Sequence, residues 1–192
     1  MGYGHWGTMR GKYDRERGAT LIEAAIILPT LLLIVLSIVE LGLAFKDFLT
    51  TDFAAKEGAR VGALAGNDVD ADCDIIQSIV AGYTGTDFDK LHEITVFRVS
   101  ETGAPVPGTE NDWTFANNPG QDPTDCDEWA QSNPSGWPPG NSRNVVVGSE
   151  PLHIIGITID TEHDWVTGFP PWRGTMNIVR TAIQRLEPEA FE

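Results

Sequence analysis

A single carboxylate at the head of a long apolar run is the pattern that most directly suggests chemistry. Glu23 lies five residues after Gly18, and the segment from Ala24 to Val39 carries no charge. A carboxylate in lipid costs roughly 2.5–3.5 kcal/mol on insertion scales, so Glu23 needs a partner. Hydrolysis between Gly18 and Ala19 would create an α-amine one helical turn from Glu23. We therefore predict that cleavage after Gly18 supplies the positive charge that pairs with Glu23.

The two cysteines are a candidate disulfide. Cys73 and Cys126 both follow the apolar run, so they lie outside the cytoplasm if that run crosses a membrane with its start inside. A bridge between them would contribute roughly 4 kcal/mol by restricting the unfolded chain. It would also tether a segment rich in proline and glycine to the helical layer. We expect this disulfide, and two free thiols are the alternative.

Acidic residues gather near both cysteines, so a disulfide would bring two acidic segments together. Hard oxygen ligands in a flexible acidic loop suit calcium, with an affinity on the order of 10⁻⁴ to 10⁻³ M. The first acidic segment lacks the glycine and the glutamate of an EF-hand loop, so that motif is not predicted. We prefer the simpler expectation that the carboxylates splay into solvent. The candidate calcium ligands are Asp68, Asp70, Asp72, Asp125 and Asp127.

The sequence shows no arrangement typical of an enzyme. Its four histidines do not form an HExxH motif, and two cysteines are too few for a closed zinc site. There is no serine in a nucleophile elbow and no glycine-rich loop with a phosphate-binding lysine. His163 and Asp164 precede Trp165, which we expect to fill the core at a strand end. We predict no catalytic activity and no cofactor.

A membrane helix is the element that must carry Glu23. Residues 24–45 carry no charge apart from Glu40, and 22 residues at about 1.5 Å each span roughly 33 Å, the thickness of a bilayer core. A cleavable secretory signal is the competing interpretation, but its apolar region would be shorter and followed by a small-residue cleavage site. Here Glu40, Lys46 and Asp47 follow instead, so we expect the helix to remain.

Charge orients this helix and excludes one class of partner. The first 18 residues carry a net charge of +2, which leaves −17 for the rest of a chain whose total is −15. A basic segment before the apolar run predicts a cytoplasmic N-terminus and an exported C-terminal domain. The acidic remainder lacks the basic face that phosphate binding requires, so nucleic acid is not expected as a partner.

Four short motifs together resemble those of one protein family. They are RGATLIEAAIILP at 17–29, KEGARVGA at 56–63, HDWVTG at 163–168 and RTAIQRLEP at 180–188. This combination resembles the TadE-like proteins of tight-adherence (Flp) pilus systems, within the type IV pilin superfamily. The resemblance covers both ends of the chain and fails between roughly residues 100 and 143.

The resemblance implies a function, partners and a location. It implies a minor pilin or pseudopilin that acts in pilus assembly or adhesion after a prepilin peptidase removes the leader at the Gly18–Ala19 bond. Its partners would be that peptidase, other pilus subunits, inner-membrane assembly proteins and the membrane itself. The protein would cross the plasma (inner) membrane once and could enter an extracellular pilus.

Beyond the membrane, apolar residues continue at helical spacing, so the helix should extend into the aqueous side. Gly58, Gly62 and Gly66 then recur every four residues and allow another backbone to approach closely. Either a second subunit or the chain's own sheet could pack against this ridge, and the sequence leaves both open.

The remaining segments predict an α+β, pilin-like fold in which the long helix, membrane-spanning in its first half, packs on a small antiparallel sheet. We expect a short helix at 75–83, a strand within 93–99, and further strand-like segments at 145–147, 153–161 and 175–186. Three or four strands follow from that order. The predicted divisions are a basic, disordered leader at 1–18, a long helix at 19–66 and an exported domain at 67–192, which includes a loop at 100–143.

The tryptophans of that loop support a second hypothesis from another class. Trp113, Trp129 and Trp137 could form an aromatic platform for glycans or another surface. The protein would then be a permanently anchored, exported binding domain with an intact N-terminus.

Overall fold

The structure is a computed structural model, and it describes residues 10–83, 90–116, 118–133, 137–140, 142–148, 150–168 and 173–188, with side chains from Gly18 onward. The chain divides into two compact units, Met1–Leu43 and Ala44–Glu192.

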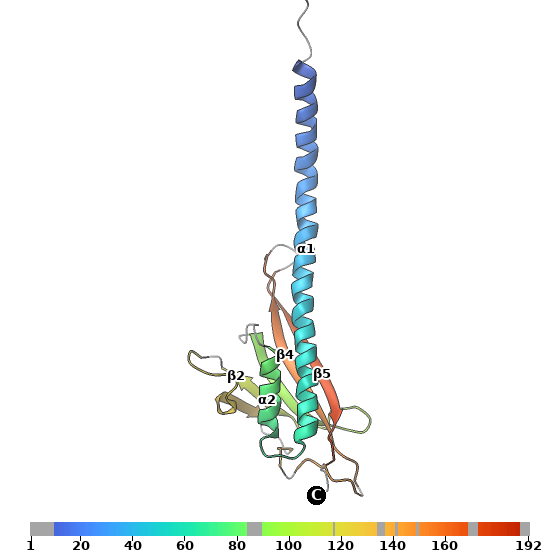
Figure 1. Cartoon of the computed structure of the whole chain (residues 1–192), viewed down its shortest axis with the longest axis vertical. Helices are drawn as coiled ribbons and strands as arrows, with labels where there is room; N and C mark the ends of the chain where they lie inside the picture. Colours follow the sequence, from blue (N-terminus) through green and yellow to red (C-terminus); the bar gives the residue numbers. More distant parts are fainter. Residues whose placement is uncertain are drawn as a thin grey trace, which may run out of the picture. The chain divides into compact units, whose positions relative to one another are not determined.

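The long helix α1 runs from Arg10 to Ala65 and continues through Pro29 (Figure 1). It begins earlier than the sequence predicted, because residues 10–17 are helical rather than disordered. An existing helix extends over adjacent residues without a new nucleation step, and Arg, Lys and Glu are good helix formers. The Gly18–Ala19 bond therefore lies inside a helix.

In the first unit, α1 exposes apolar side chains on all its faces. Leu21, Ile26 and Ile38 are each about two-thirds exposed, at 71%, 70% and 65%. An 18-residue window of the helix reaches a mean hydropathy of 2.6 with none of it buried. A helix that is apolar all round requires an apolar environment. By length and composition, this helix could cross a membrane.

The second unit contains a five-stranded antiparallel sheet in the order β3-β2-β1-β4-β5. Its strands are β1 (Leu91–Val99), β2 (Asn111–Phe115), β3 (Trp129–Asn133), β4 (Ile154–Asp164) and β5 (Thr175–Arg185).

Two of these strands lie in the segment that was predicted as a loop. Both β2 and β3, with the 3₁₀ turn η2 (Cys126–Glu128), fall within residues 100–143. Each strand is five residues long and largely polar, so the alternation of apolar and polar residues that would reveal a strand is weak. Pairing with β1 fixes β2 in the sheet. The described sheet thus has five strands where three or four were expected. Residues 145–147 were predicted as a strand and belong to none.

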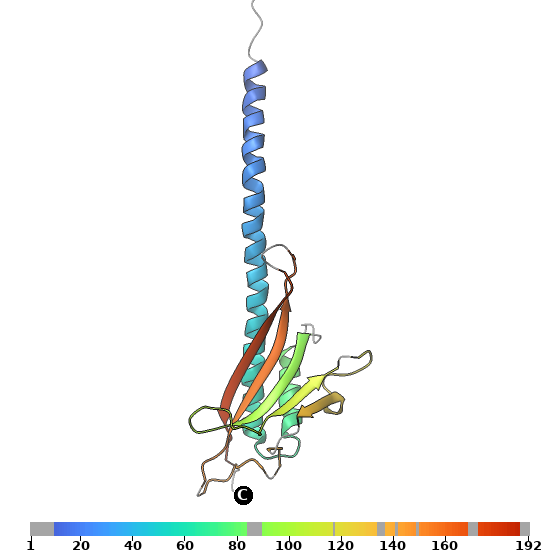
Figure 2. The same cartoon turned by 180° about the vertical axis from the view of Figure 1, so that it is seen from behind.

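Two helices cover one face of the sheet. The short helix α2 (Ala71–Gly82) and the part of α1 in this unit lie side by side on it, and the opposite face is seen in Figure 2. The core between helices and sheet is rich in isoleucine. Its fully buried members include Ile75, Ile76, Ile79, Ile94, Ile155, Ile157 and Ile159. The predicted α+β class, with a long N-terminal helix and a small antiparallel sheet, is confirmed.

The glycine ridge packs within this unit. A Cβ atom at Gly58 would lie 2.8 Å from Cγ1 of Ile79, and one at Gly62 would lie 2.8 Å from Cδ1 of Ile75 and 2.9 Å from Cδ1 of Ile155. Gly66 has φ of +57° and follows the last residue of α1, where a left-handed conformation closes the helix. Of the two alternatives left open, the structure shows the contact with the chain's own layers.

Candidate processing and assembly site

The predicted cleavage site lies within helix α1. Gly18 and Ala19 lie on α1, and apart from the adjoining residues and the helix's own backbone, no heavy atom in the described part of the chain is within 4 Å of a Cβ built on Gly18. Ala19 and Thr20 are exposed.

Glu23 lies one helical turn after Ala19 on α1. It follows Ala19 by four residues on one continuous helix, and residues at this spacing share a face with Cβ atoms about 5–6 Å apart. Its side chain is exposed among apolar neighbours. Among the side chains described, from Gly18 onward, Glu23 has no ion pair. A new amine at Ala19, or the amine of a neighbouring copy, could reach it.

A buried ion pair, which the sequence did not reveal, joins the start of α2 to the segment before β4. The Arg143 guanidinium donates from Nη2 to Oδ1 of Asp72, and both side chains are at most 5% exposed. Asn111 donates from Nδ2 to the other carboxylate oxygen at 3.1 Å. The guanidinium also lies over the Trp137 ring, 4.6 Å from its centroid. These groups hold α2, β2 and the segment at Arg143 together.

This network corrects the calcium hypothesis. Asp72 is buried and paired with Arg143, so it does not face the acidic residues around the disulfide. Asp125 accepts a hydrogen bond from the Asp127 amide at 3.0 Å and caps η2. Within the described ranges, no three His, Cys, Asp or Glu side chains lie close enough to hold a metal ion. Two of the five candidate ligands, Asp72 and Asp125, therefore have structural roles.

The cysteines are joined. The Cys73–Cys126 disulfide links α2 to η2 across 53 residues, with Cα atoms 5.6 Å apart. It attaches the β2–β3 part of the sheet to the helical layer, as a bridge at these positions was expected to do.

A second polar cluster lies where α1 crosses the end of β4. His163 Nδ1 is 2.7 Å from Oδ2 of Asp47, and the imidazole meets the Trp165 ring edge-on at 5.0 Å. Tyr83 donates its hydroxyl to Thr51 at 2.9 Å, and burial raises the pKa of that phenol.

The buried ring at the end of β4 is His163, whereas Trp165, which was expected to fill the core, is only partly buried. The alternation of β4 places His163 inward and is the signal that could have found it.

The tryptophan platform is not present. Trp129 and Trp137 are 4% and 3% exposed and belong to the hydrophobic core, and Trp113 packs against that core. Trp129 also donates its indole N–H to the Pro123 carbonyl at 2.9 Å. These rings stabilise the segment that was predicted as a loop and cannot form a flat exposed surface.

Fold and site together define an α+β protein whose apolar N-terminal helix could anchor it in a membrane. Residues 18–60 match the family model of TadE-like proteins, so the resemblance is confirmed over the segment that contains Gly18, Glu23 and Gly58. The match covers less than half of the chain. No curated protein and no solved structure matches the chain.

Proposed function

We propose that this chain is a minor pilin or pseudopilin of a tight-adherence pilus, cleaved after Gly18 and active in pilus assembly or adhesion. The observation that carries the proposal is the exposed apolar helix with Gly18, Ala19 and Glu23 at its start, all inside the segment that matches the family. The proposed divisions are a leader at 1–18, a helix at 19–66 and an exported domain at 67–192.

The proposed sequence of events follows from the charges. The basic leader holds the N-terminus in the cytoplasm while residues 24–45 cross the inner membrane. A prepilin peptidase then hydrolyses the Gly18–Ala19 peptide bond. Water adds its hydroxyl group to the Gly18 carbonyl carbon and a proton to the Ala19 nitrogen, which leaves a carboxylate on Gly18 and an α-amine on Ala19. That amine pairs with Glu23 of the same chain or of a neighbouring subunit, which removes the cost of a lone carboxylate in lipid. Pilus subunits and inner-membrane assembly proteins are the partners in this scheme.

The processing step is tested by Gly18→Leu with Gly42→Leu as its matched control. Both glycines lie on α1, and at both a built Cβ meets nothing within 4 Å beyond the adjoining residues and the helix's own backbone, so neither substitution creates a clash in the described structure. In cells that hold the complete pilus system, Gly18→Leu should leave a precursor longer by about 18 residues on an immunoblot, because a side chain there hinders the peptidase. Gly42→Leu should be processed normally. Normal processing of Gly18→Leu would refute the proposed cleavage.

The pairing step is tested separately by Glu23→Ala. This variant should insert and be cleaved, because the leader is intact, but it should reduce pilus numbers. Asp74→Asn, an exposed acidic residue on α2, serves as the control for loss of one negative charge. Wild-type pilus numbers with Glu23→Ala would remove the pairing role and leave the cleavage proposal standing.

A further inference from the structure

The hairpin formed by β4 and β5 projects beyond the rest of the sheet. β4 pairs with β1 only as far as Thr161, but it pairs with β5 as far as Asp164. Figure 2 shows both strands extending past the start of β1. The tip that joins them is described over residues 165–168 and 173–174.

Contacts with α1 at both ends of β4 show which way the tip points. Near the start of β4, Cδ1 of Ile155 lies 2.9 Å from a Cβ built on Gly62, in the last turn of α1. At the other end of the strand, His163 Nδ1 lies 2.7 Å from Oδ2 of Asp47. β4 therefore runs opposite to α1, and the chain leaves β4 in the direction of Ala44, the first residue of the second unit.

With α1 across the bilayer, as proposed above, this direction brings the tip to the membrane surface. The apolar run ends at Phe45, two residues before Asp47, which is about 3 Å along a helix. The headgroup layer is about 5–8 Å thick on each side of the hydrocarbon core. Asp47 and His163 then lie within that layer. Val166 follows His163 by three residues, at up to about 3.3 Å each, so it can reach the boundary with the acyl chains.

The side chains at this end of the unit suit a boundary between water and lipid. Val166 is 72% exposed and Phe45 is 60% exposed, so both present apolar surface. The partly buried Trp165 ring meets the His163 ring edge-on at 5.0 Å. Aromatic rings, tryptophan above all, are enriched where membrane proteins cross the headgroup layer.

One cation at the tip is available to lipid phosphate. Asp164 lies 3.8 Å from the Lys90 ammonium, and Asp47 is paired with His163. Arg173 is exposed and has no ion pair among the described residues. A guanidinium binds phosphate through two parallel N–H donors. The tip thus combines an exposed apolar side chain, an indole ring and an unpaired guanidinium.

We propose that the tip of the β4–β5 hairpin is a second membrane contact, with Val166 at the acyl boundary and Trp165 and Arg173 among the headgroups. This contact holds the second unit against the bilayer that α1 crosses. A subunit that leaves the membrane for a pilus must therefore break it. The inference rests on the membrane crossing that is part of the proposed function, and its test separates the two.

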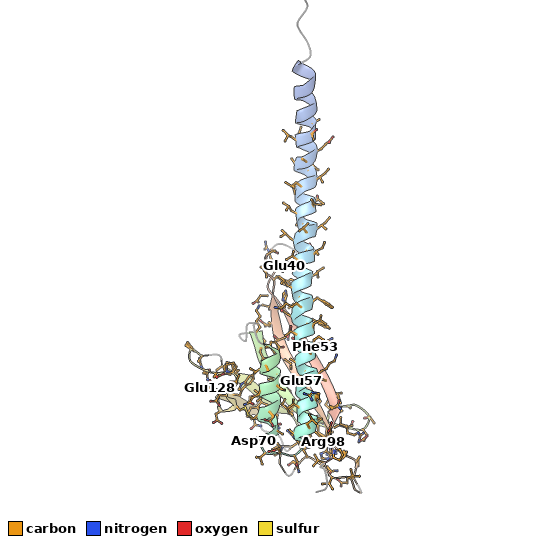
Figure 3. All side chains as sticks on the ribbon, viewed as in Figure 1. Glu40, Phe53, Glu57, Asp70, Arg98 and Glu128 are labelled. Atoms are coloured by element: carbon orange, nitrogen blue, oxygen red, sulfur yellow. A yellow bond between two sulfur atoms is a disulfide. The ribbon has the colours of Figure 1, made fainter. Side chains whose placement is uncertain are left out.

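The test is fluorescence quenching of the full chain in liposomes of phosphatidylcholine and phosphatidylglycerol. The two native cysteines are joined, so only an introduced cysteine takes the NBD fluorophore. Val166→Cys reports on the tip, and Val35→Cys reports on the apolar run of α1. Val147→Cys is the matched control, because Val147 is 61% exposed and follows the segment that contacts Gly66 after the end of α1. Figure 3 marks that end of the sheet by Arg98.

The quencher is a nitroxide, carried on the headgroup of one lipid and deep in the acyl chain of another. Val166→Cys should lose more fluorescence to the headgroup nitroxide, and Val35→Cys should lose more to the acyl nitroxide. Val147→Cys should lose none to either. All three positions are about half exposed or more, so the substitutions leave the core intact.

A charge reversal tests the headgroup contact. Adding Arg173→Glu to the labelled Val166→Cys chain should lower the ratio of bound to free tips about 30-fold, because each unit of charge near an anionic surface changes such a ratio about fivefold. The headgroup quenching should fall accordingly. Arg185→Glu, at the other end of β5, makes the same change of charge and should leave the quenching at Val166 unchanged.

Two results would overturn the inference and leave the proposed membrane helix standing. They are equal quenching at Val166 and Val147, or no headgroup quenching at Val166 while Val35 is quenched. The second result would mean that water or a protein partner, rather than lipid, covers Val166. No quenching at Val35 would refute the membrane crossing and this contact together. Equal effects of Arg173→Glu and Arg185→Glu would overturn the part assigned to Arg173.

Discussion

Replacement of Arg143 by methionine should lower the free energy of unfolding of the second unit by about 3–5 kcal/mol. Methionine keeps much of the apolar stem but removes the guanidinium that pairs with Asp72. The Asp72 carboxylate would then remain buried with the Asn111 amide as its neutral partner. The contact between the guanidinium and the Trp137 ring would be lost as well. Most of the cost comes from the uncompensated charge.

A double variant separates this cost from lost packing. Asp72→Asn with Arg143→Met removes both charges, so it should recover part of the loss, and the two substitutions should be strongly non-additive. Arg185→Gln is the matched control, because Arg185 makes a two-point contact with Glu101 at 3.1 and 2.7 Å but both side chains are about half exposed. Solvent screens that pair, so its loss should leave the unfolding curve unchanged within error.

The assay is urea unfolding of the full chain in maltoside micelles, followed by tryptophan fluorescence. Trp137, one of the six tryptophans that contribute to this signal, contacts the Arg143 guanidinium. A midpoint for Arg143→Met that is no lower than that of Arg185→Gln would show that the buried pair does not hold this unit together.

Three other substitutions test the packing, the bridge and the sheet electrostatics. Gly62→Ala should lower the melting temperature, because its Cβ would lie 2.8 Å from Ile75 and 2.9 Å from Ile155. The overpacking costs about 1–3 kcal/mol, whereas the higher helix propensity of alanine stabilises by about 1 kcal/mol. A higher melting temperature would contradict the packing account. Cys73→Ser should destabilise the second unit by roughly 4 kcal/mol in urea, and an unchanged midpoint would mean that the bridge restrains nothing. Burial, then the nearby charges of Asp112 and Asp160, raise the pKa of Glu93, so its ionisation opposes folding above that pKa. Glu93→Gln should therefore raise the melting temperature at pH 7, and this increase should disappear by about pH 4. An increase that does not depend on pH would refute the ionisation of Glu93 as its cause.

The parts of the fold that follow local patterns were predictable. The apolar run identified the first half of α1, and the β-branched alternation at 93–99 and 175–186 identified β1 and β5. The cysteine pair was also accessible, because only two cysteines exist. The helix was placed correctly at Gly58 and Gly62, although its packing partner was left open until Ile75 and Ile155 were located.

The parts that depend on contacts between distant segments were not predictable. β2 and β3 are short and polar, and they become strands through hydrogen bonds to a neighbour that the sequence does not specify. Asp72 resembled its acidic neighbours until Arg143, 71 residues away, was found beside it. The tryptophans also appeared exposed because the surrounding segment is rich in proline and glycine.

The central claim is that this chain is a processed pilus subunit, and mass spectrometry of its N-terminus tests that claim most directly. The protein is purified from cells that contain the complete pilus system, and its N-terminal peptide is sequenced. The account predicts a chain that begins at Ala19, with an amine free to pair with Glu23. A chain that retains residues 1–18, or one trimmed at a site other than the Gly18–Ala19 bond, would contradict it.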